Sequence, residues 1–198
     1  VVSADGPYRD KSFKEMVQLA KEKPGTVRIS MLPGTMFEYM VEQVEQVTGA
    51  KFLKVPFQGG APSVTALLGG NVDIALGFYG EIRSFLEAGK LKPVGVSSSE
   101  RSPFMKDTPT VNESLGRTDI VWGATRWVAV PAGVAPDRRA YLAAGFNAAV
   151  RDPELQEEFR KLGTVVDTSL DTPEKIKKHL DDLAAMEREF YQKTGRLK

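Results

Sequence analysis

Short runs of β-branched and apolar residues alternate with stretches of helical periodicity through the first half of the chain, and this alternation limits the fold more than any other feature. Strands are predicted at residues 27–31, 51–55, 72–76 and 93–96. Each is preceded by an amphipathic helix, and these helices are predicted to begin near Ser12, Thr35, Ala61 and Glu81. Strands separated by helices favour a mostly parallel sheet with helices on its faces, which is the α/β class.

The second half of the chain has a different character. Residues 97–110 are rich in Ser, Pro and Thr and are predicted to run as a surface loop. Short strands are predicted at 120–122, 127–130 and 164–166, and helices at 137–150, 153–162 and 172–192. We expect a domain break near 118–131, with one part at 1–122 and the other at 123–198.

Composition excludes several classes of protein. The 198 residues carry 27 Lys and Arg against 26 Asp and Glu, for a net charge of +1, so the basic excess typical of nucleic-acid binders is missing. The absence of cysteine excludes disulfides, thiol catalysis and cysteine-ligated metals. No apolar run approaches the roughly 20 residues that span a bilayer.

Signals for catalysis or for a metal are weak. His179 is the only histidine, and it belongs to a charged helical segment where a solvated surface position is favoured over a catalytic base. The chain contains no nucleophile elbow, no H-E-x-x-H and no phosphate-binding glycine loop. We therefore expect no enzyme activity, no metal and no cofactor.

Two predicted turns share one design, in which a strand ends, a glycine turn follows and a helix begins. They are residues 30–35 and 55–61, and glycines at 34, 59 and 60 would let a ligand approach the backbone. In a parallel sheet both turns lie at the carboxyl ends of strands, where helix N-termini suit a carboxylate. Thr35 is predicted either to cap its helix or to donate to a ligand, and Gln58 offers an amide donor. The alternative is that these turns only reverse the chain.

Aromatic residues and one arginine add to the candidate site. Phe78, Tyr79, Trp122 and Trp127 are candidates for a pocket wall, although core packing is the default for aromatic residues in an α/β domain. Arg126 lies next to Trp127 in an otherwise apolar stretch and requires a partner. A ligand carboxylate held in bidentate fashion and a structural ion pair are equally compatible with the sequence.

Several segments together resemble one known family. They are V-P-F-Q-G-G-A-P at 55–62, L-L-G-G-N-V-D at 67–73, A-G-K-L-K at 88–92, V-G-V-S at 94–97, E-R-S at 100–102, T-P-T-V-N-E at 108–113 and V-P-A-G-V at 130–134. In this order they are similar to the tripartite tricarboxylate transporter receptors, the TctC-like or Bug solute-binding proteins. The resemblance covers essentially the whole chain.

The resemblance implies a periplasmic-binding-protein-like, two-lobed Venus flytrap that clamps a small organic acid in the periplasm and delivers it to integral membrane permease subunits. Alternatives are a ligand-sensing receptor for a sensor kinase and an α/β enzyme acting on organic acids. The residues expected at the ligand are Pro33, Gly34, Thr35, Met36, Phe57, Gln58, Gly59, Gly60, Ala61, Phe78, Tyr79 and Arg126.

The chain departs from the family pattern in two ways. Family members begin with a strand and a Pro- and Gly-rich loop that this chain does not show. Residues 1–122 would then be the second lobe, and 123–198 the returning part of the first lobe. If the leading strands are absent, we expect unpaired strand edges after residue 120 and self-association. In addition, the helix start at residues 33–38 is bulkier than in the family, which favours an acid with an apolar or aromatic body.

Overall fold

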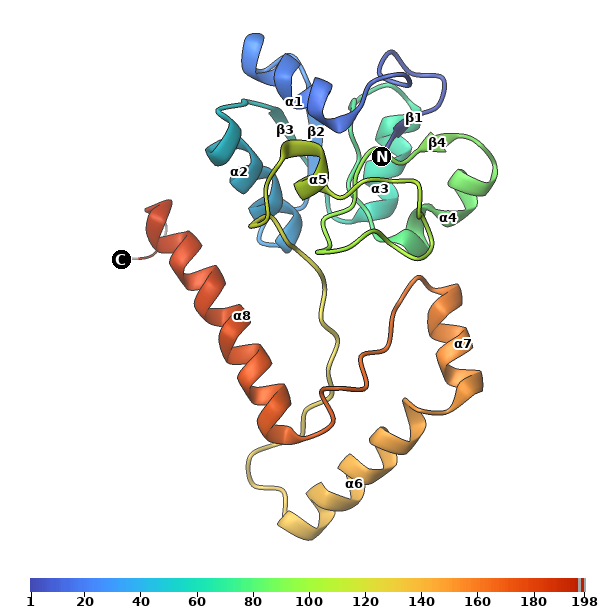
Figure 1. Cartoon of the computed structure of the whole chain (residues 1–198), viewed down its shortest axis with the longest axis vertical. Helices are drawn as coiled ribbons and strands as arrows, with labels where there is room; N and C mark the ends of the chain where they lie inside the picture. Colours follow the sequence, from blue (N-terminus) through green and yellow to red (C-terminus); the bar gives the residue numbers. More distant parts are fainter. Residues whose placement is uncertain (196, 198) are drawn as a thin grey trace. The chain divides into compact units, whose positions relative to one another are not determined.

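The computed structural model describes residues 1–195 and 197, and it divides into two compact units, Val1–Trp127 and Val128–Lys198 (Figure 1). The boundary after Trp127 lies within the interval 118–131 expected for the domain break, and beyond the division expected at residue 122. The reason is that Ile120 and Trp122 are both buried, so the chain leaves this core only beyond them. That the two units are lobes of one receptor stays a prediction.

Two short pairs of strands lie at the centre of the first unit. β2 (Arg28–Met31) and β3 (Leu53–Pro56) are parallel, as predicted, with Arg28 opposite Leu53. β1 (Val2–Ser3) and β4 (Leu91–Lys92) pair in antiparallel fashion. The segment around Ile74 connects the two pairs, because Ile29 forms a parallel bridge with Ile74 and the Ala75 amide donates to the Val1 carbonyl at 2.9 Å.

Two of the predicted strands are reduced to isolated bridges. Segment 72–76 pairs with β2 only at Ile74, since side chains take over the neighbouring hydrogen bonds. The Leu76 amide donates to Ser30 Oγ at 2.9 Å, and the Arg28 amide donates to Asp73 Oδ2 at 2.8 Å. Segment 93–96 likewise forms one bridge, between Val96 and Thr110, and β4 ends just before it.

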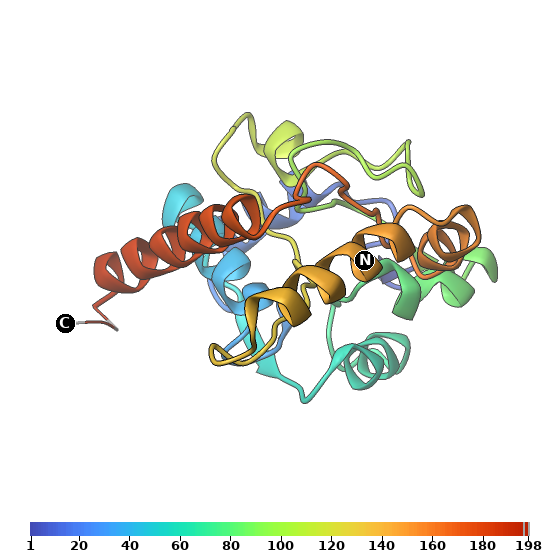
Figure 2. The ribbon, with the colours of Figure 1, turned by 90° about the horizontal axis from the view of Figure 1, so that it is seen from below.

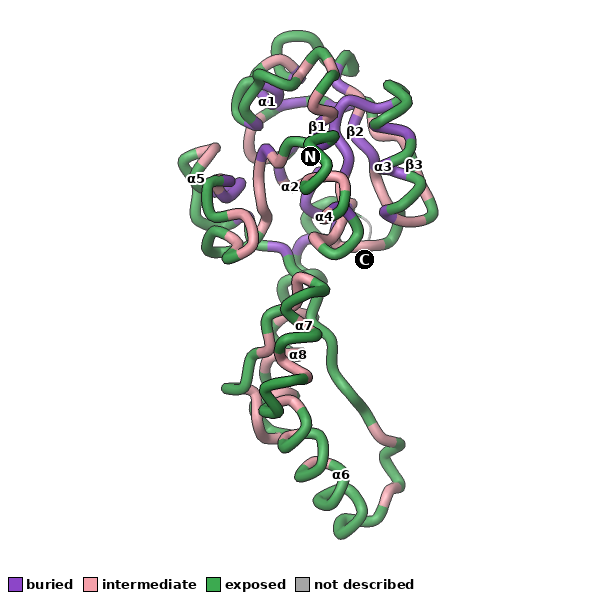
Figure 3. Tube along the Cα trace, turned by 90° about the vertical axis from the view of Figure 1, so that its right-hand side faces the viewer, coloured by how far each residue is buried: buried purple, intermediate pink, exposed green. Residues whose placement is uncertain are grey.

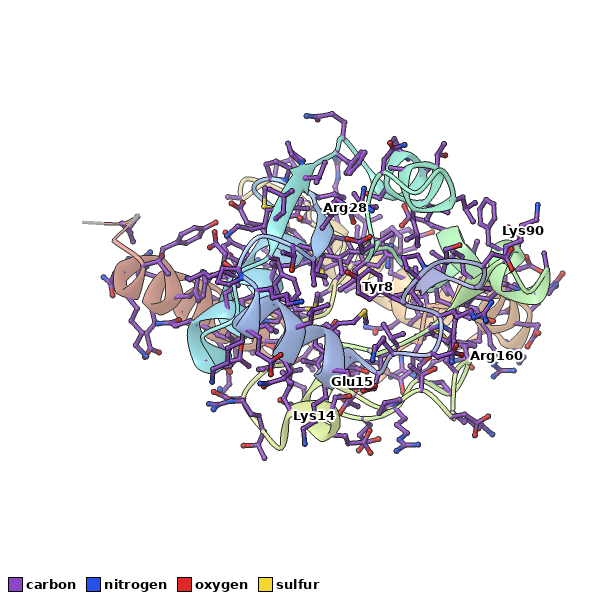
Figure 4. The ribbon with its side chains drawn as sticks, turned by 90° about the horizontal axis from the view of Figure 1, so that it is seen from above. Tyr8, Lys14, Glu15, Arg28, Lys90 and Arg160 are labelled. Atoms are coloured by element: carbon purple, nitrogen blue, oxygen red, sulfur yellow. The ribbon has the colours of Figure 1, made fainter. Side chains whose placement is uncertain are left out.

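The Asp73 carboxylate ties this segment to β2. It is nearly buried, and it also accepts hydrogen bonds from Arg28 Nη2 at 2.6 Å and from Nε at 3.1 Å. Tyr8, labelled with Arg28 in Figure 4, lies close enough to the pair that burial first, and then the Asp73 charge, raises its pKa. This ion pair therefore holds the strand and the segment in register.

Five helices surround these strands, and their starts and ends follow from local sequence. They are α1 (Phe13–Glu22), α2 (Met36–Thr48), α3 (Gly60–Leu68), α4 (Tyr79–Glu87) and α5 (Val111–Leu115). Ser12 begins α1 with a capping box to Glu15, and Gly49 ends α2 in the left-handed conformation. The four amphipathic helices predicted for this half are confirmed.

The buried core of the chain lies in the first unit. One cluster comprises Val64, Ala66, Leu67, Val72, Ala75, Ile82 and Leu91. It joins α3 and α4 to the segment beside β2, and it places both helix starts on a rigid base. Figure 3 shows the buried residues gathered around these strands, with exposed and half-buried residues along α6, α7 and α8.

The second unit is helical. It contains α6 (Pro136–Ala149), α7 (Pro153–Lys161) and α8 (Pro173–Lys193), each with proline in its first turn, and α8 is one continuous helix (red in Figure 2). All three agree with the predicted helices. Among the residues that the structure describes here, only Phe190 is buried. None of the described helices is both long and apolar enough to cross a bilayer.

The strands predicted at 120–122, 127–130 and 164–166 are wrong, since the described residues form no strand there. At the first of them, the Ile120 amide donates to Asn112 Oδ1 at 3.0 Å, and the Trp122 amide makes one backbone hydrogen bond, to the Ser97 carbonyl at 2.8 Å, so no ladder forms. The other two contain the exposed Val128 and Val165. Exposed strand edges after residue 120 are thus also wrong, while self-association stays a prediction.

Candidate functional site

A cavity of about 230 Å³ lies within the first unit. Its wall comes from the start of α2, the turn after Ile74 that leads into α4, the segment after β4, and the chain around Trp122. Its lining includes Met36, Phe37, Met40, Phe78, Tyr79, Ser97, Ser98, Ser102, Met105 and Trp122. The cavity is therefore a concave site built mainly from stretches of one unit that lie far apart in the sequence.

The lining is apolar, with a few hydroxyl groups. No side chain in it is acidic or basic, and its polar side chains are three serines, the Tyr79 phenol and the Trp122 indole. A small number of polar groups in an apolar wall is the usual composition of a small-molecule site. The site can thus hold an apolar body and orient it through hydroxyl groups.

Aromatic pairs fix the shape of the wall. The rings of Phe37 and Phe78 are 5.1 Å apart between centroids and tilted by 56°. Tyr79 stacks on Phe104 at 4.9 Å. The Trp122 indole N–H donates to Gln43 Oε1 at 2.6 Å, so this buried ring is held in one orientation. These contacts prearrange the cavity before any ligand enters it.

Arg126 places a positive charge beside this wall. Its guanidinium carbon lies 5.6 Å from the centroid of the Phe78 ring, which is a cation–π distance. Arg126 is exposed, and no carboxylate of the described residues forms an ion pair with it. The sequence left two partners open for Arg126, a ligand carboxylate and a structural ion pair. The described residues supply no such ion pair, so the guanidinium N–H groups can donate to a ligand anion.

The first glycine turn is already occupied by the chain itself. The Gly34 amide donates to Glu38 Oε2 at 2.7 Å. Thr35 caps α2, because its Oγ1 accepts from the Phe37 amide at 3.3 Å and donates to the Leu32 carbonyl at 2.7 Å. Of the residues predicted here, Met36 lines the cavity, and Pro33, Gly34 and Thr35 do not.

The second glycine turn lies outside the cavity wall. Phe57 packs against the core cluster, and its amide donates to the Met31 carbonyl at 2.8 Å. Gln58 is exposed. At Gly60, a Cβ atom would come within 2.3 Å of Glu81 Oε2, so an internal carboxylate lies against the start of α3. Residues Phe57, Gln58, Gly59, Gly60 and Ala61 thus do not line the cavity, and their contact with a ligand stays a prediction.

The structure brings together Met36, Phe78, Tyr79 and Arg126 from the predicted set, and it adds residues that sequence reasoning assigned elsewhere. Ser97, Ser98, Ser102 and Met105 were expected in a surface loop, and they line the cavity. Ser97 and Ser102 belong to the segments V-G-V-S and E-R-S, which resemble the family. In the sequence these segments indicated the family, and they were not assigned to the ligand site. Trp122 lines the cavity, whereas Trp127 is 55% exposed.

Within the described part of the chain, no three His, Asp or Glu side chains gather in a way that could hold a metal ion. His179 lies on α8 in the second unit.

Comparisons with known proteins agree with this architecture. The family model described as "Tripartite tricarboxylate transporter family receptor" matches residues 1–195. A UPF0065 protein of Pseudomonas, from the tcbD-tcbE intergenic region, is 28% identical over 194 residues, covering 98% of this chain and 55% of that protein. The chain therefore spans about half the length of this curated relative.

Solved structures share the fold. The periplasmic binding protein BugD superimposes with a TM-score of 0.83 at 25% identity, over 99% of this chain and 65% of that one. A protein of R. palustris solved with adipate gives a TM-score of 0.83 at 20% identity, over 98% and 64% of the two chains. The periplasmic-binding-protein fold is thus present.

Proposed function

The chain belongs to the tripartite tricarboxylate transporter receptor family, and from that premise we propose that it forms the ligand-binding part of a periplasmic receptor for a small organic carboxylate. The receptor delivers its ligand to integral membrane permease subunits. Family and fold are those of substrate-binding proteins, and the function proposed is binding without turnover.

One observation carries the proposal. Arg126 has no carboxylate partner in the described chain, and it lies over Phe78, whose ring forms part of the cavity wall. A guanidinium in this position can donate two parallel hydrogen bonds to a carboxylate, and this geometry is specific for planar anions. The apolar wall then receives the rest of the acid. A cavity and one cation together make a site for an amphipathic organic acid.

The likeness to carboxylate-bound proteins supports the same ligand chemistry. The R. palustris neighbour was solved with adipate, an unbranched acid with an apolar body. The cavity wall described above is likewise suited to an apolar body. A catalytic role has less support, since general acid–base chemistry requires a positioned titratable pair, and no acidic or basic side chain lines this cavity.

Isothermal titration calorimetry of the natural protein tests the proposal. The panel contains mono-, di- and tricarboxylates, each with its uncharged amide as the matched control. We expect saturable binding of at least one acid and no binding of its amide, because the carboxylate is what Arg126 recognises. Failure of every acid in the panel, or equal binding of an acid and its amide, would remove the basis for the receptor.

The transport step needs a separate test. Cells that lack the permease subunits should take up the identified acid more slowly. The purified receptor should bind the acid with the same affinity as before. Fractionation should recover the receptor with periplasmic markers. Uptake that does not depend on the permease would contradict the proposed partnership and leave the binding function in place.

A further inference from the structure

The charge of the cavity lining limits the class of ligand. No acidic or basic side chain lines the cavity, and Arg126 beside Phe78 is the cation placed to meet an anion there. A second or third carboxylate inside the cavity would lie against apolar side chains, and burial of an unpaired charge is strongly unfavourable. The site is therefore matched to a ligand with a single carboxylate.

The shape and chemistry of the wall favour a ring over a chain. Phe37 and Phe78 present tilted rings 5.1 Å apart, and Met36, Met40 and Met105 add thioether groups to the same wall. Aromatic rings prefer tilted or offset contacts with one another, and thioether sulfur makes favourable contacts with ring edges. An aromatic guest gains from both kinds of contact, whereas a flexible chain would also lose conformational entropy on binding.

The size of the cavity suits a guest with one ring. Its volume of about 230 Å³ accommodates a six-membered ring with a carboxylate.

One serine offers a free hydroxyl proton to such a ligand. Ser97 Oγ donates to the Trp122 carbonyl at 2.7 Å, and Ser98 Oγ donates to the Glu100 carbonyl. Ser102 Oγ instead accepts from the Phe104 amide at 3.2 Å, and the described residues show no acceptor for its own proton. Among the lining serines, Ser102 is thus the one whose O–H can donate to a guest.

Resting on the proposed function, we propose that the ligand is a single-ring aromatic monocarboxylate. Its ring lies between the aromatic and methionine side chains of the cavity. Its carboxylate is held by Arg126, and Ser102 donates a hydrogen bond to the ligand.

The test compares benzoate, cyclohexanecarboxylate, adipate and citrate by calorimetry on the natural protein. Benzoate should bind at least about tenfold more tightly than adipate or citrate, and more tightly than the saturated ring by about threefold or more. Tighter binding of adipate or citrate would overturn the ligand class and leave the receptor function standing. Equal affinity for the saturated ring would overturn the aromatic assignment. If neither these four acids nor any acid of the wider panel binds, the proposed receptor function itself is contradicted.

Tryptophan fluorescence locates the acid. In a Trp127→Phe variant, the remaining indole is Trp122 in the cavity wall, and benzoate should change its emission with the same midpoint as the calorimetric titration. Ser102→Ala should weaken benzoate binding by about three- to tenfold. Ser99→Ala, at an exposed position outside the cavity lining, is the matched control and should bind like the wild type. Binding without a change at Trp122, or a Ser102→Ala variant of undiminished affinity, would contradict the proposed site.

Discussion

The guanidinium of Arg126 lies 5.6 Å from the centroid of the Phe78 ring, and this pair connects a cation that has no ion-pair partner among the described residues to the wall of the cavity. Phe78 also contacts Phe37 at the start of α2. The arginine is therefore placed by aromatic contacts and not by an internal salt bridge. An incoming carboxylate does not have to displace a competing anion from it.

Arg126→Gln should weaken binding of the acid by about ten- to a hundredfold, the range expected when a hydrogen-bonded ion pair is lost. Thermal stability should change little, since the side chain is exposed. Arg139→Gln, on an exposed arginine of α6, is the matched control. Calorimetry on both variants checks this prediction, and equal loss of affinity in the control would argue against a local role for Arg126.

Gly60→Ala should destabilise the protein by about 1 kcal/mol, the usual range for a disturbed helix cap. The new Cβ would lie 2.3 Å from Glu81 Oε2, and this carboxylate accepts the Phe78 amide at the start of α4. Urea unfolding measures the change. In a Glu81→Ala background, Gly60→Ala should destabilise the protein less, because the carboxylate that the new Cβ would meet is absent. Gly133→Ala, where a Cβ would meet no atom within 4 Å, should be nearly neutral.

Asp73→Asn should cost about 2–3 kcal/mol of unfolding free energy, because charge-assisted hydrogen bonds to Arg28 are lost. Arg28 is partly exposed, so water offsets some of the loss. Asp10→Asn is the control, since Asp10 pairs with Arg9 on the surface and should contribute about 0.5 kcal/mol or less. Equal destabilisation by both variants in urea would show that burial of the Asp73 pair does not determine the loss of unfolding free energy.

Glu113 should make the segment beside the cavity sensitive to acid. The Thr110 amide and then Arg101 lower the pKa of its carboxyl below the usual 4.5. A lowered folded pKa means that the contribution is present above pH 4.5 and is lost as pH falls through the folded value. Glu113→Gln should therefore be less stable than the wild type near neutral pH.

Thermal melts from about pH 7 to about pH 3 measure this difference, which should shrink below the usual carboxyl pKa. Arg101 donates to Glu113 at 3.0 Å and directly precedes Ser102, so this ion pair adjoins the cavity lining. Glu100→Gln, at an exposed position, serves as the control. A difference between Glu113→Gln and the wild type that is independent of pH would contradict the assignment.

Local signals explain how much of the fold was predictable. Ser12 with Glu15, Gly49, and the prolines that open the three last helices each act within a few residues, so the sequence alone places these helix ends. Strands depend on partners far along the chain. Residues 120–122 have a strand-like composition, yet the Ile120 amide donates to the side chain of Asn112. No local sequence pattern predicts that hydrogen bond.

The candidate site was likewise predictable only in part. Phe78, Tyr79 and Arg126 stood out by residue type, and Met36 by its place after a glycine turn. Ser102 did not, because its hydroxyl differs from those of Ser97 and Ser98 only through contacts that the folded chain makes. At the two glycine turns, internal carboxylates lie close by: Glu38 accepts the Gly34 amide, and Glu81, which accepts the Phe78 amide, lies against Gly60.

A crystal structure of the natural protein with a bound organic acid would show directly whether Arg126 holds the ligand. We expect the carboxylate to lie about 2.7–3.2 Å from the guanidinium nitrogens of Arg126, with the body of the acid against Phe78. An acid whose carboxylate is bound elsewhere, with Arg126 in contact with solvent only, would contradict it.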